Sequence, residues 1–262
     1  MEHRQFGSLS LSLVGLGCNN FGNRCDERRS AEVVHAALAA GITTFDTADV
    51  YSRGVSEEHL GKALGNRRDE VVIATKFANP MDDSGKRQGA SARWITEAVE
   101  DSLRRLGTDR IDLYQQHVPD DSVDLSETMG ALDALVRAGK VREIGHSNFS
   151  ADQIDEAAAV ATEHGFHPFA TAQNELSLVR RRAADEVLPA CERNGLGMLP
   201  YFPLASGLLT GKYRRGEAPP EGTRLASIPE ERQEKALSDK RFDLVERLES
   251  FAFERGHSLL EL

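Results

Sequence analysis

Short apolar runs alternate with longer amphipathic stretches along most of the chain. The runs have the length of β-strands, are rich in Val, Ile, Leu and Ala, and end in polar residues. They lie at 11–17, 42–46, 71–76, 111–117, 141–147, 169–174 and 196–201. Stretches with helical periodicity separate them, at 29–40, 56–65, 91–106, 126–138, 150–164 and 180–194. The pattern therefore predicts a repeated strand–helix unit with short connections.

Glycines and serines mark the predicted helix ends. A glycine ends or directly follows each helical stretch, where a left-handed residue commonly ends a helix: Gly41, Gly65, Gly107, Gly139, Gly165 and Gly195. Serines stand near four of the helix starts, where a hydroxyl can accept hydrogen bonds from free backbone N–H groups: Ser30, Ser91, Ser126 and Ser150. These residues support the boundaries that the periodicity indicates.

Repeated strand–helix units imply a parallel sheet with helices outside it. No linker or composition shift divides the 262 residues, and seven such units are one short of a (β/α)8 barrel. We therefore predict an α/β fold, a TIM-type (β/α)8 barrel in a single domain over 1–262, that lacks the eighth strand and the final helix. The alternation in "GSLSLSL" near the start predicts a small hairpin that closes one end of the barrel.

The segment after residue 201 breaks the rhythm of strands and helices. Residues 201–235 are rich in Gly, Pro and basic side chains, and loops of this length in compact domains are often functional. A charged helix is predicted at about 239–256, and no eighth strand is predicted after it. We therefore expect residues 201–235 to form a functional loop.

Composition and charge narrow the class of partner. The chain is 40% hydrophobic and 28% charged, as in ordinary globular proteins, and its net charge of −10 argues against nucleic acid or an acidic membrane as the main partner. No apolar run approaches the ~18 residues that span a bilayer, and the N-terminus lacks the apolar core of a signal peptide. The simplest prediction is a cytoplasmic protein that acts on a small molecule, with the oligomeric state left open.

Three cysteines, Cys18, Cys25 and Cys191, form no CxxC pair. Their odd number and their spacing favour free thiols over a disulfide framework or a zinc site. We therefore predict no metal site.

Polar side chains stand at the predicted carboxyl ends of three consecutive strands. The second strand ends in Asp46, with Tyr51 five residues later; the third ends in Lys76 and the fourth in His117. Each alone is more often a turn, surface or structural residue. However, the carboxyl ends of parallel barrel strands meet at one mouth, which carries the chemistry of such barrels. We therefore expect the four side chains to share one pocket.

A carboxylate, a phenol, an ammonium and an imidazole in one pocket suit proton delivery to a carbonyl oxygen while hydride reaches the carbonyl carbon. A phenol with a pKa of about 10 is a weak acid near neutrality. We expect the Lys76 ammonium to lower the pKa of Tyr51 and His117 to orient the carbonyl oxygen. Asp46 would hold the lysine, whereas Asp49 is predicted to be only a turn residue.

The stretch "GLGCNN" at 15–20 contains the first part of a dinucleotide-binding glycine motif. The third glycine position holds Asn20, and the next predicted helix begins only near residue 29, whereas the Rossmann motif needs a helix that opens immediately. The glycines are therefore interpreted as lining the barrel mouth.

Motifs spread over essentially the whole chain resemble those of the aldo-keto reductases. The segments are "GLGCNNFG", "GITTFDTADVY", "SEEHLGKAL", "VVIATK", "IDLYQQHVPD", "GKVREIGHSNFS", "AQNELSL" and "YFPLASGLLTGKY". The resemblance implies reduction of aldehyde or ketone carbonyls to alcohols by hydride transfer from NADPH, with NADH as the alternative cofactor. It also implies a catalytic tetrad of Asp46, Tyr51, Lys76 and His117, with Tyr51 as the general acid.

The resemblance assigns cofactor and substrate residues as well. Ser147, Asn148 and Gln173 fall where the family binds the nicotinamide carboxamide, and Tyr201 falls where a ring stacks on the nicotinamide. The loop 203–215 resembles the pyrophosphate-binding loop, with Leu204, Ser206, Gly207 and Lys212 as its cofactor residues. Asn19 and Phe21 fall at the substrate pocket, although Phe21 is equally consistent with packing. The family's basic segment for the adenosine 2′-phosphate has no counterpart here, so a preference for NADPH depends on the resemblance alone.

Two other functions compete with carbonyl reduction. One is a non-catalytic regulatory subunit of the same fold that binds the nicotinamide cofactor, against which the complete tetrad argues. The other is a metal-dependent barrel hydrolase built on His117 and His146, against which the lack of an H-x-H pair argues. The sequence does not identify the substrate.

Overall fold

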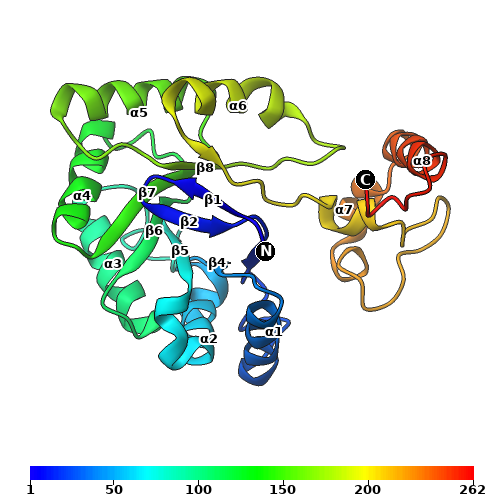
Figure 1. Cartoon of the computed structure of the whole chain (residues 1–262), viewed down its shortest axis with the longest axis horizontal. Helices are drawn as coiled ribbons and strands as arrows, with labels where there is room; N and C mark the ends of the chain where they lie inside the picture. Colours follow the sequence, from blue (N-terminus) through cyan, green and yellow to red (C-terminus); the bar gives the residue numbers. More distant parts are fainter. The chain divides into compact units, whose positions relative to one another are not determined.

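The computed structural model describes all 262 residues (Figure 1). The chain forms two compact units. We call the first, Met1–Gln173 with Leu188–Leu199, the sheet unit, and the second, Asn174–Val187 with Pro200–Leu262, the C-terminal unit. The single domain expected over 1–262 stays a prediction.

Seven parallel strands form the sheet of the sheet unit, and they lie in chain order. They are β3 (Gly15–Gly17), β4 (Thr44–Asp46), β5 (Val72–Phe77), β6 (Ile111–Gln116), β7 (Val141–Ser147), β8 (Thr171–Gln173) and β9 (Gly197–Met198). Every neighbouring pair is parallel, and β3 and β9 are the two edges. This arrangement confirms the predicted fold class, a (β/α)8-type barrel without its eighth strand.

Helices connect the strands. They are α1 (Glu27–Ala39), α2 (Val55–Leu64), α3 (Ala92–Leu106), α4 (Leu125–Arg137), α5 (Ala151–His164) and α6 (Arg182–Asn194), with short 3-10 segments η1 (Tyr51–Gly54) and η2 (Gly65–Glu70). Helices α1 to α5 form an arc outside the strands, and each contacts the next (Figure 1). In α3 the apolar residues recur every three or four positions, so Trp94, Ile95, Val99 and Leu103 are buried on one face.

Two serines cap helices as predicted. Ser91 accepts a hydrogen bond from the backbone N–H of Trp94 before α3, and Ser150 forms a reciprocal capping box with Gln153 before α5. The predicted caps at Ser30 and Ser126 are wrong, because both helices begin earlier and these serines lie in the first turn. The caps there are Asp26 and Asp124.

The first predicted strand, 11–17, is two separate elements. Residues Leu9–Ser12 (β2) pair antiparallel with His3–Phe6 (β1), which is the hairpin expected near the N-terminus. The break follows Ser12, whose N–H donates to Thr44 Oγ1 and whose hydroxyl donates to the carbonyl of Val14. Leu9 and Leu11 of β2 pack against Val72, Ala74 and Leu113, so the hairpin covers apolar side chains of the sheet.

The C-terminal unit has an apolar cluster of its own. It contains η3 (Ala205–Thr210), η4 (Leu225–Ser227), α7 (Glu230–Ala236) and α8 (Asp239–Phe253). The buried side chains are Leu208, Leu209, Tyr213, Leu225, Phe242, Val245 and Leu259. Helix α8 agrees with the predicted charged helix, whereas α7 is short, without buried residues, and has no periodic signal. No helix of the chain combines the length and the apolar character needed to cross a bilayer.

Candidate active site

A buried ion pair joins the ends of β4 and β5. Lys76 Nζ donates to Asp46 Oδ2 at 2.6 Å and to the carbonyl oxygen of Thr47 at 2.9 Å. The lysine side chain is fully buried, while 23% of the aspartate side chain is exposed. Burial acts to lower the pKa of Lys76, but Asp46 and Tyr51 outweigh it, so the pKa is raised above its usual value. Lys76 therefore remains an ammonium at neutral pH.

Tyr51 is the first residue of η1, the element that follows β4, and its ring lies close to both Lys76 and His117. The ammonium of Lys76 lies 5.2 Å from the centroid of the phenol ring, and the centroid of the His117 ring lies 5.7 Å from it in an edge-to-face arrangement. Burial raises the pKa of the Tyr51 phenol, and Lys76 only partly opposes this effect. Lys76 therefore acts in the expected direction, but the net pKa is raised, because removing the phenol from water disfavours the phenolate more than Lys76 favours it.

His117 follows β6, and its backbone N–H donates to the carbonyl of Phe77 on β5 at 2.9 Å. Burial, with help from Lys76, lowers the pKa of His117 to about 4. The imidazole is therefore neutral at pH 7 and offers one N–H donor and one acceptor. Thus the structure brings together the four side chains that the strand ends predict: Asp46, Tyr51, Lys76 and His117.

Three polar residues at the ends of β7 and β8 are hydrogen-bonded to this group. Gln173 Nε2 donates to Asp46 Oδ1 at 2.9 Å, and Ser147 Oγ donates to the carbonyl of Gln173 at 2.8 Å. The amide nitrogen of Asn148 donates to the carbonyl of His117 at 2.9 Å and to Ser147 Oγ at 3.0 Å. These contacts place the predicted carboxamide-binding residues of the sheet unit beside the four catalytic candidates.

The amide-rich edge at Gln173 fits a ligand that carries a carboxamide. Because the side-chain nitrogen of Gln173 donates to Asp46, the side-chain oxygen is left as an acceptor for an N–H group. A nicotinamide carboxamide provides such an N–H group, so the residues present fit the cofactor that the resemblance implies.

The predicted pyrophosphate loop lies in the C-terminal unit and has an unusual backbone. Ala205, Ser206 and Gly207 have successive positive φ values of 48°, 60° and 95°. A Cβ on Gly207 would lie 2.8 Å from Lys212 Cε and 2.9 Å from Lys212 Nζ, so the end of the lysine side chain lies directly over this turn. The φ of 95° favours glycine at this position. A glycine turn under an exposed ammonium fits a phosphate ligand.

Other residues of the C-terminal unit surround this loop. The half-buried Tyr201 contacts Phe202 edge-to-face, and the exposed Leu204 accepts the N–H of Gly207 at 2.9 Å. Arg215 is held by Asp239, Asp243 and Glu246, and Arg214 pairs with Glu249. Lys212 is thus the cation of this loop for which the structure shows no carboxylate partner. The cofactor roles of Tyr201, Leu204, Ser206, Gly207 and Lys212 stay predictions.

The two predicted substrate residues differ in burial. Phe21 is 2% exposed, and its carbonyl accepts the Ser52 hydroxyl at 2.9 Å, so its backbone supports the turn that carries Tyr51. Asn19 is half-buried in the loop after β3. Contact of either residue with substrate stays a prediction.

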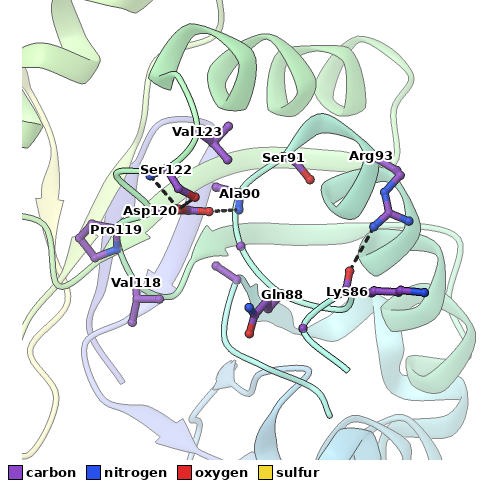
Figure 2. A pocket seen from close by; sticks show the side chains of 13 residues that line it. Lys86, Gln88, Ala90, Ser91, Arg93, Val118, Pro119, Asp120, Ser122 and Val123 are labelled. Carbon is purple, nitrogen blue, oxygen red and sulfur yellow. Dashed lines mark hydrogen bonds between the residues drawn. The ribbon is translucent and has the colours of Figure 1, made fainter. Parts of the chain in front are cut away.

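A pocket of about 420 Å³ lies beside the ends of β5 and β6 (Figure 2). Two loops line it, one starting at Ala78 and the other at Val118, directly after His117. Asp120 joins the loops, because its Oδ2 accepts the N–H of Ala90 at 2.8 Å. The exposed cations Lys86 and Arg93 also line the pocket. The sequence offers no periodic or motif signal for these loops.

Two acidic residues near Tyr51, Asp49 and Glu57, are buried, and the sequence analysis predicts burial of neither. Asp49, expected to be a turn residue, is 1% exposed, and Glu57 is fully buried. Burial, reinforced by the Glu57 carboxylate, raises the pKa of Asp49 to about 8. The closely spaced acids in "ADVYSRGVSEE" are the only signal that could have indicated them, and such spacing is usual on exposed turns.

Comparison with known proteins adds a family match over most of the chain. A model of the "Aldo/keto reductase family" matches residues 13–262. The uncharacterized oxidoreductase YrpG of Bacillus subtilis is 38% identical over 260 residues, which cover 94% of this chain and 75% of that protein. The aldo-keto reductase YhdN of the same organism is 42% identical over 210 residues, covering 78% of this chain and 62% of that protein. Versiconal hemiacetal acetate reductase of Aspergillus parasiticus is 33% identical over 290 residues, which cover 100% of this chain and 84% of that protein.

Proposed function

The chain belongs to the aldo/keto reductase family, whose members are oxidoreductases of carbonyl compounds, and we propose from this premise that it reduces aldehydes or ketones to alcohols with NADPH. The observation that carries the proposal is the Lys76–Asp46 pair at 2.6 Å beside the rings of Tyr51 and His117. An acid, a cation that stabilises its conjugate base and a neutral hydrogen-bond donor are the groups that carbonyl reduction needs.

Each of the four residues has a separate role in the proposal. When bound, a nicotinamide cofactor would supply the hydride that the carbonyl carbon accepts. Tyr51 gives its phenolic proton to the carbonyl oxygen, and the Lys76 ammonium stabilises the phenolate that remains until solvent returns a proton. Asp46 holds Lys76 in place, and the neutral His117 orients the carbonyl oxygen through an N–H hydrogen bond. The raised pKa of Tyr51 keeps the phenol protonated, and therefore available as an acid, throughout the neutral range.

The cofactor and substrate assignments belong to the same proposal. We assign the nicotinamide carboxamide to Ser147, Asn148 and Gln173. Ring stacking is assigned to Tyr201, pyrophosphate binding to Leu204, Ser206, Gly207 and Lys212, and substrate contact to Asn19 and Phe21. The family resemblance supports NADPH over NADH.

Replacement of the phenol tests the proposal directly. In Tyr51→Phe the proton donor is lost, so we expect kcat to fall by about 10²–10⁴-fold. Binding of NADPH, followed by the change in its fluorescence, should stay within about twofold, because the ring remains. Tyr114→Phe is the matched control: Tyr114 is a fully buried tyrosine stacked on Phe77, and its hydroxyl has no proposed role.

Three outcomes would contradict parts of this proposal. Unchanged turnover in Tyr51→Phe would remove the assigned acid. No saturable change in NADPH fluorescence at high protein concentration would remove the cofactor. Saturable binding without turnover of any compound in a broad aldehyde panel would support a regulatory, non-catalytic subunit instead.

A further inference from the structure

The turn that presents Tyr51 has a strained backbone. The three residues that follow the tyrosine, Ser52, Arg53 and Gly54, have φ values of 51°, 55° and 95°. Only glycine adopts this left-handed region freely, and residues with a Cβ stay there when the surrounding structure holds them. The position of Tyr51 therefore depends on contacts that hold this turn.

Arg105 of α3 provides one of these contacts. A Cβ on Gly54 would lie 2.5 Å from Arg105 Cδ and 2.8 Å from Arg105 Nε, so the arginine packs directly against the turn. Only 10% of the arginine side chain is exposed. The guanidinium thus lies beneath the segment that carries the phenol.

Glu57 connects Arg105 to the strand of Lys76. Its Oε2 accepts Arg105 Nε at 2.6 Å, and its Oε1 accepts the hydroxyl of Thr75 at 2.5 Å. Thr75 immediately precedes Lys76 on β5, and Glu57 lies in the first turn of α2, three residues after Gly54. The fully buried carboxylate is therefore bound both to the support of the Tyr51 turn and to the strand that carries the ammonium.

A buried ion pair of this kind adds little net stability, because the cost of removing both charges from water offsets their attraction. Its contribution is geometric: the planar guanidinium and the carboxylate fix the separation of the groups that they join. We propose that the Glu57–Arg105 pair is a positioning device that holds the Tyr51 phenol against Lys76, and that it thereby sets the rate of proton transfer. The effect of this ion pair on the rate of proton transfer rests on the proposed function.

Replacement of the arginine tests this proposal, with a matched control in the same chain. Arg105→Met removes the charge and keeps much of the side-chain volume. Arg68→Met is the control, because Arg68 is also almost buried (13% exposed) and pairs with the buried Asp112 at 2.8 Å. Arg68 lies before β5, at the amino ends of the strands, and its hydrogen bonds go to Val71, Thr108 and Arg110.

The expected results separate positioning from general destabilisation. Both variants should lower the Tm. At a temperature where both are folded, Arg105→Met should lower kcat by about 10- to 100-fold while KM for the carbonyl changes less than about twofold. Arg68→Met should leave kcat within about twofold. Arg105→Lys keeps the positive charge but not the planar fork, so its kcat should lie between those of wild type and Arg105→Met.

A second measurement needs neither substrate nor turnover. With tyrosine labelled at ¹³Cζ, the four tyrosines give four signals, and the one that disappears in Tyr51→Phe belongs to Tyr51. Arg105→Met should displace this signal, and Arg68→Met should leave it in place. If Arg105→Met does not fold, the same comparison is made with Arg105→Lys. If the wild-type protein showed no turnover, the proposed function would be contradicted. The displacement of the Tyr51 signal in the Arg105 variants would still test whether the ion pair positions the phenol.

Two results would overturn the positioning role. One is a Tyr51 signal that is the same in wild type and in the Arg105 variants. The other is a loss of kcat in Arg68→Met that equals the loss in Arg105→Met.

Discussion

At the scale of single residues, burial determines the protonation states of the candidate site. The pKa of His117 is lowered to about 4, because a buried imidazolium loses hydration and also faces the Lys76 ammonium. We therefore expect kcat to show no titration of this histidine near its ordinary pKa of about 6.5. In a profile of kcat from pH 4 to 9, an acid limb from His117 should appear only as the pH approaches 4. A limb centred near pH 6.5 that is lost in His117→Gln would contradict the neutral imidazole.

Asp49 leads to a prediction about stability at the same scale. Its pKa is about 8 in the folded chain, against an ordinary value of 3.8, because it is buried beside Glu57. Between these pH values the folded state keeps a proton that the unfolded state has released, so the free energy of unfolding falls as the pH rises. This group contributes a loss of at most about 1.4 kcal/mol per pH unit.

Asp49→Asn removes this titration. Relative to wild type, the variant should therefore gain stability steadily from pH 5 to pH 8, and urea unfolding at three pH values measures the difference. A difference that is independent of pH would contradict the buried, protonated carboxyl. The sequence could not predict this residue, because burial of a turn aspartate depends on long-range packing that a local pattern does not contain.

At the scale of elements, the sequence predicts the strands and helices whose positions depend on local apolar periodicity. Apolar periodicity correctly indicates the strands of the sheet and α1 to α6, because one face of each must be buried. The periodicity wrongly predicts a single strand where the structure has β2 and β3. The break at Ser12 depends on a contact with Thr44, more than thirty positions away, which a local pattern does not contain. The strand ends correctly bring Asp46, Lys76 and His117 together, because parallel topology alone aligns them. The Tyr51 turn and its support by Arg105 depend on α3 and have no local signal.

Helix caps give a prediction at this scale. Ser150 completes a capping box at α5, whereas Ser126 lies inside α4, whose cap is Asp124. We expect Ser150→Ala to lower the free energy of unfolding by about 1 kcal/mol. Ser126→Ala, the matched control, should cost only a few tenths of a kcal/mol, because the Asp124 carboxylate still accepts the backbone N–H of residue 126. Equal losses in urea unfolding would contradict this difference between a capping serine and a serine inside the first turn.

At the scale of the whole molecule, charge and chain organisation limit how an anionic cofactor can bind. Residues 201–235 have no strand or helix periodicity, yet side chains such as Leu208, Leu209 and Tyr213 join the apolar cluster of the C-terminal unit. The sequence could predict that this segment is a long interruption of the strand–helix pattern, but not that it has a core, because that core forms with α8. Its function stays a prediction. The net charge of −10 repels a dinucleotide phosphate, so favourable binding requires a local cation.

Lys212 is the cation that we expect to meet this requirement, since it lies over the Gly207 turn while Arg214 is paired with Glu249. Lys212→Met should therefore weaken NADPH binding by about tenfold in fluorescence titrations at low salt, and the difference from wild type should shrink as added salt screens the charge. Arg214→Met, which removes a cation from the same loop, should change the affinity less than about threefold. Equal losses in the two variants would mean that NADPH responds only to the net charge of the molecule. An unchanged affinity in Lys212→Met would remove this lysine from the cofactor site.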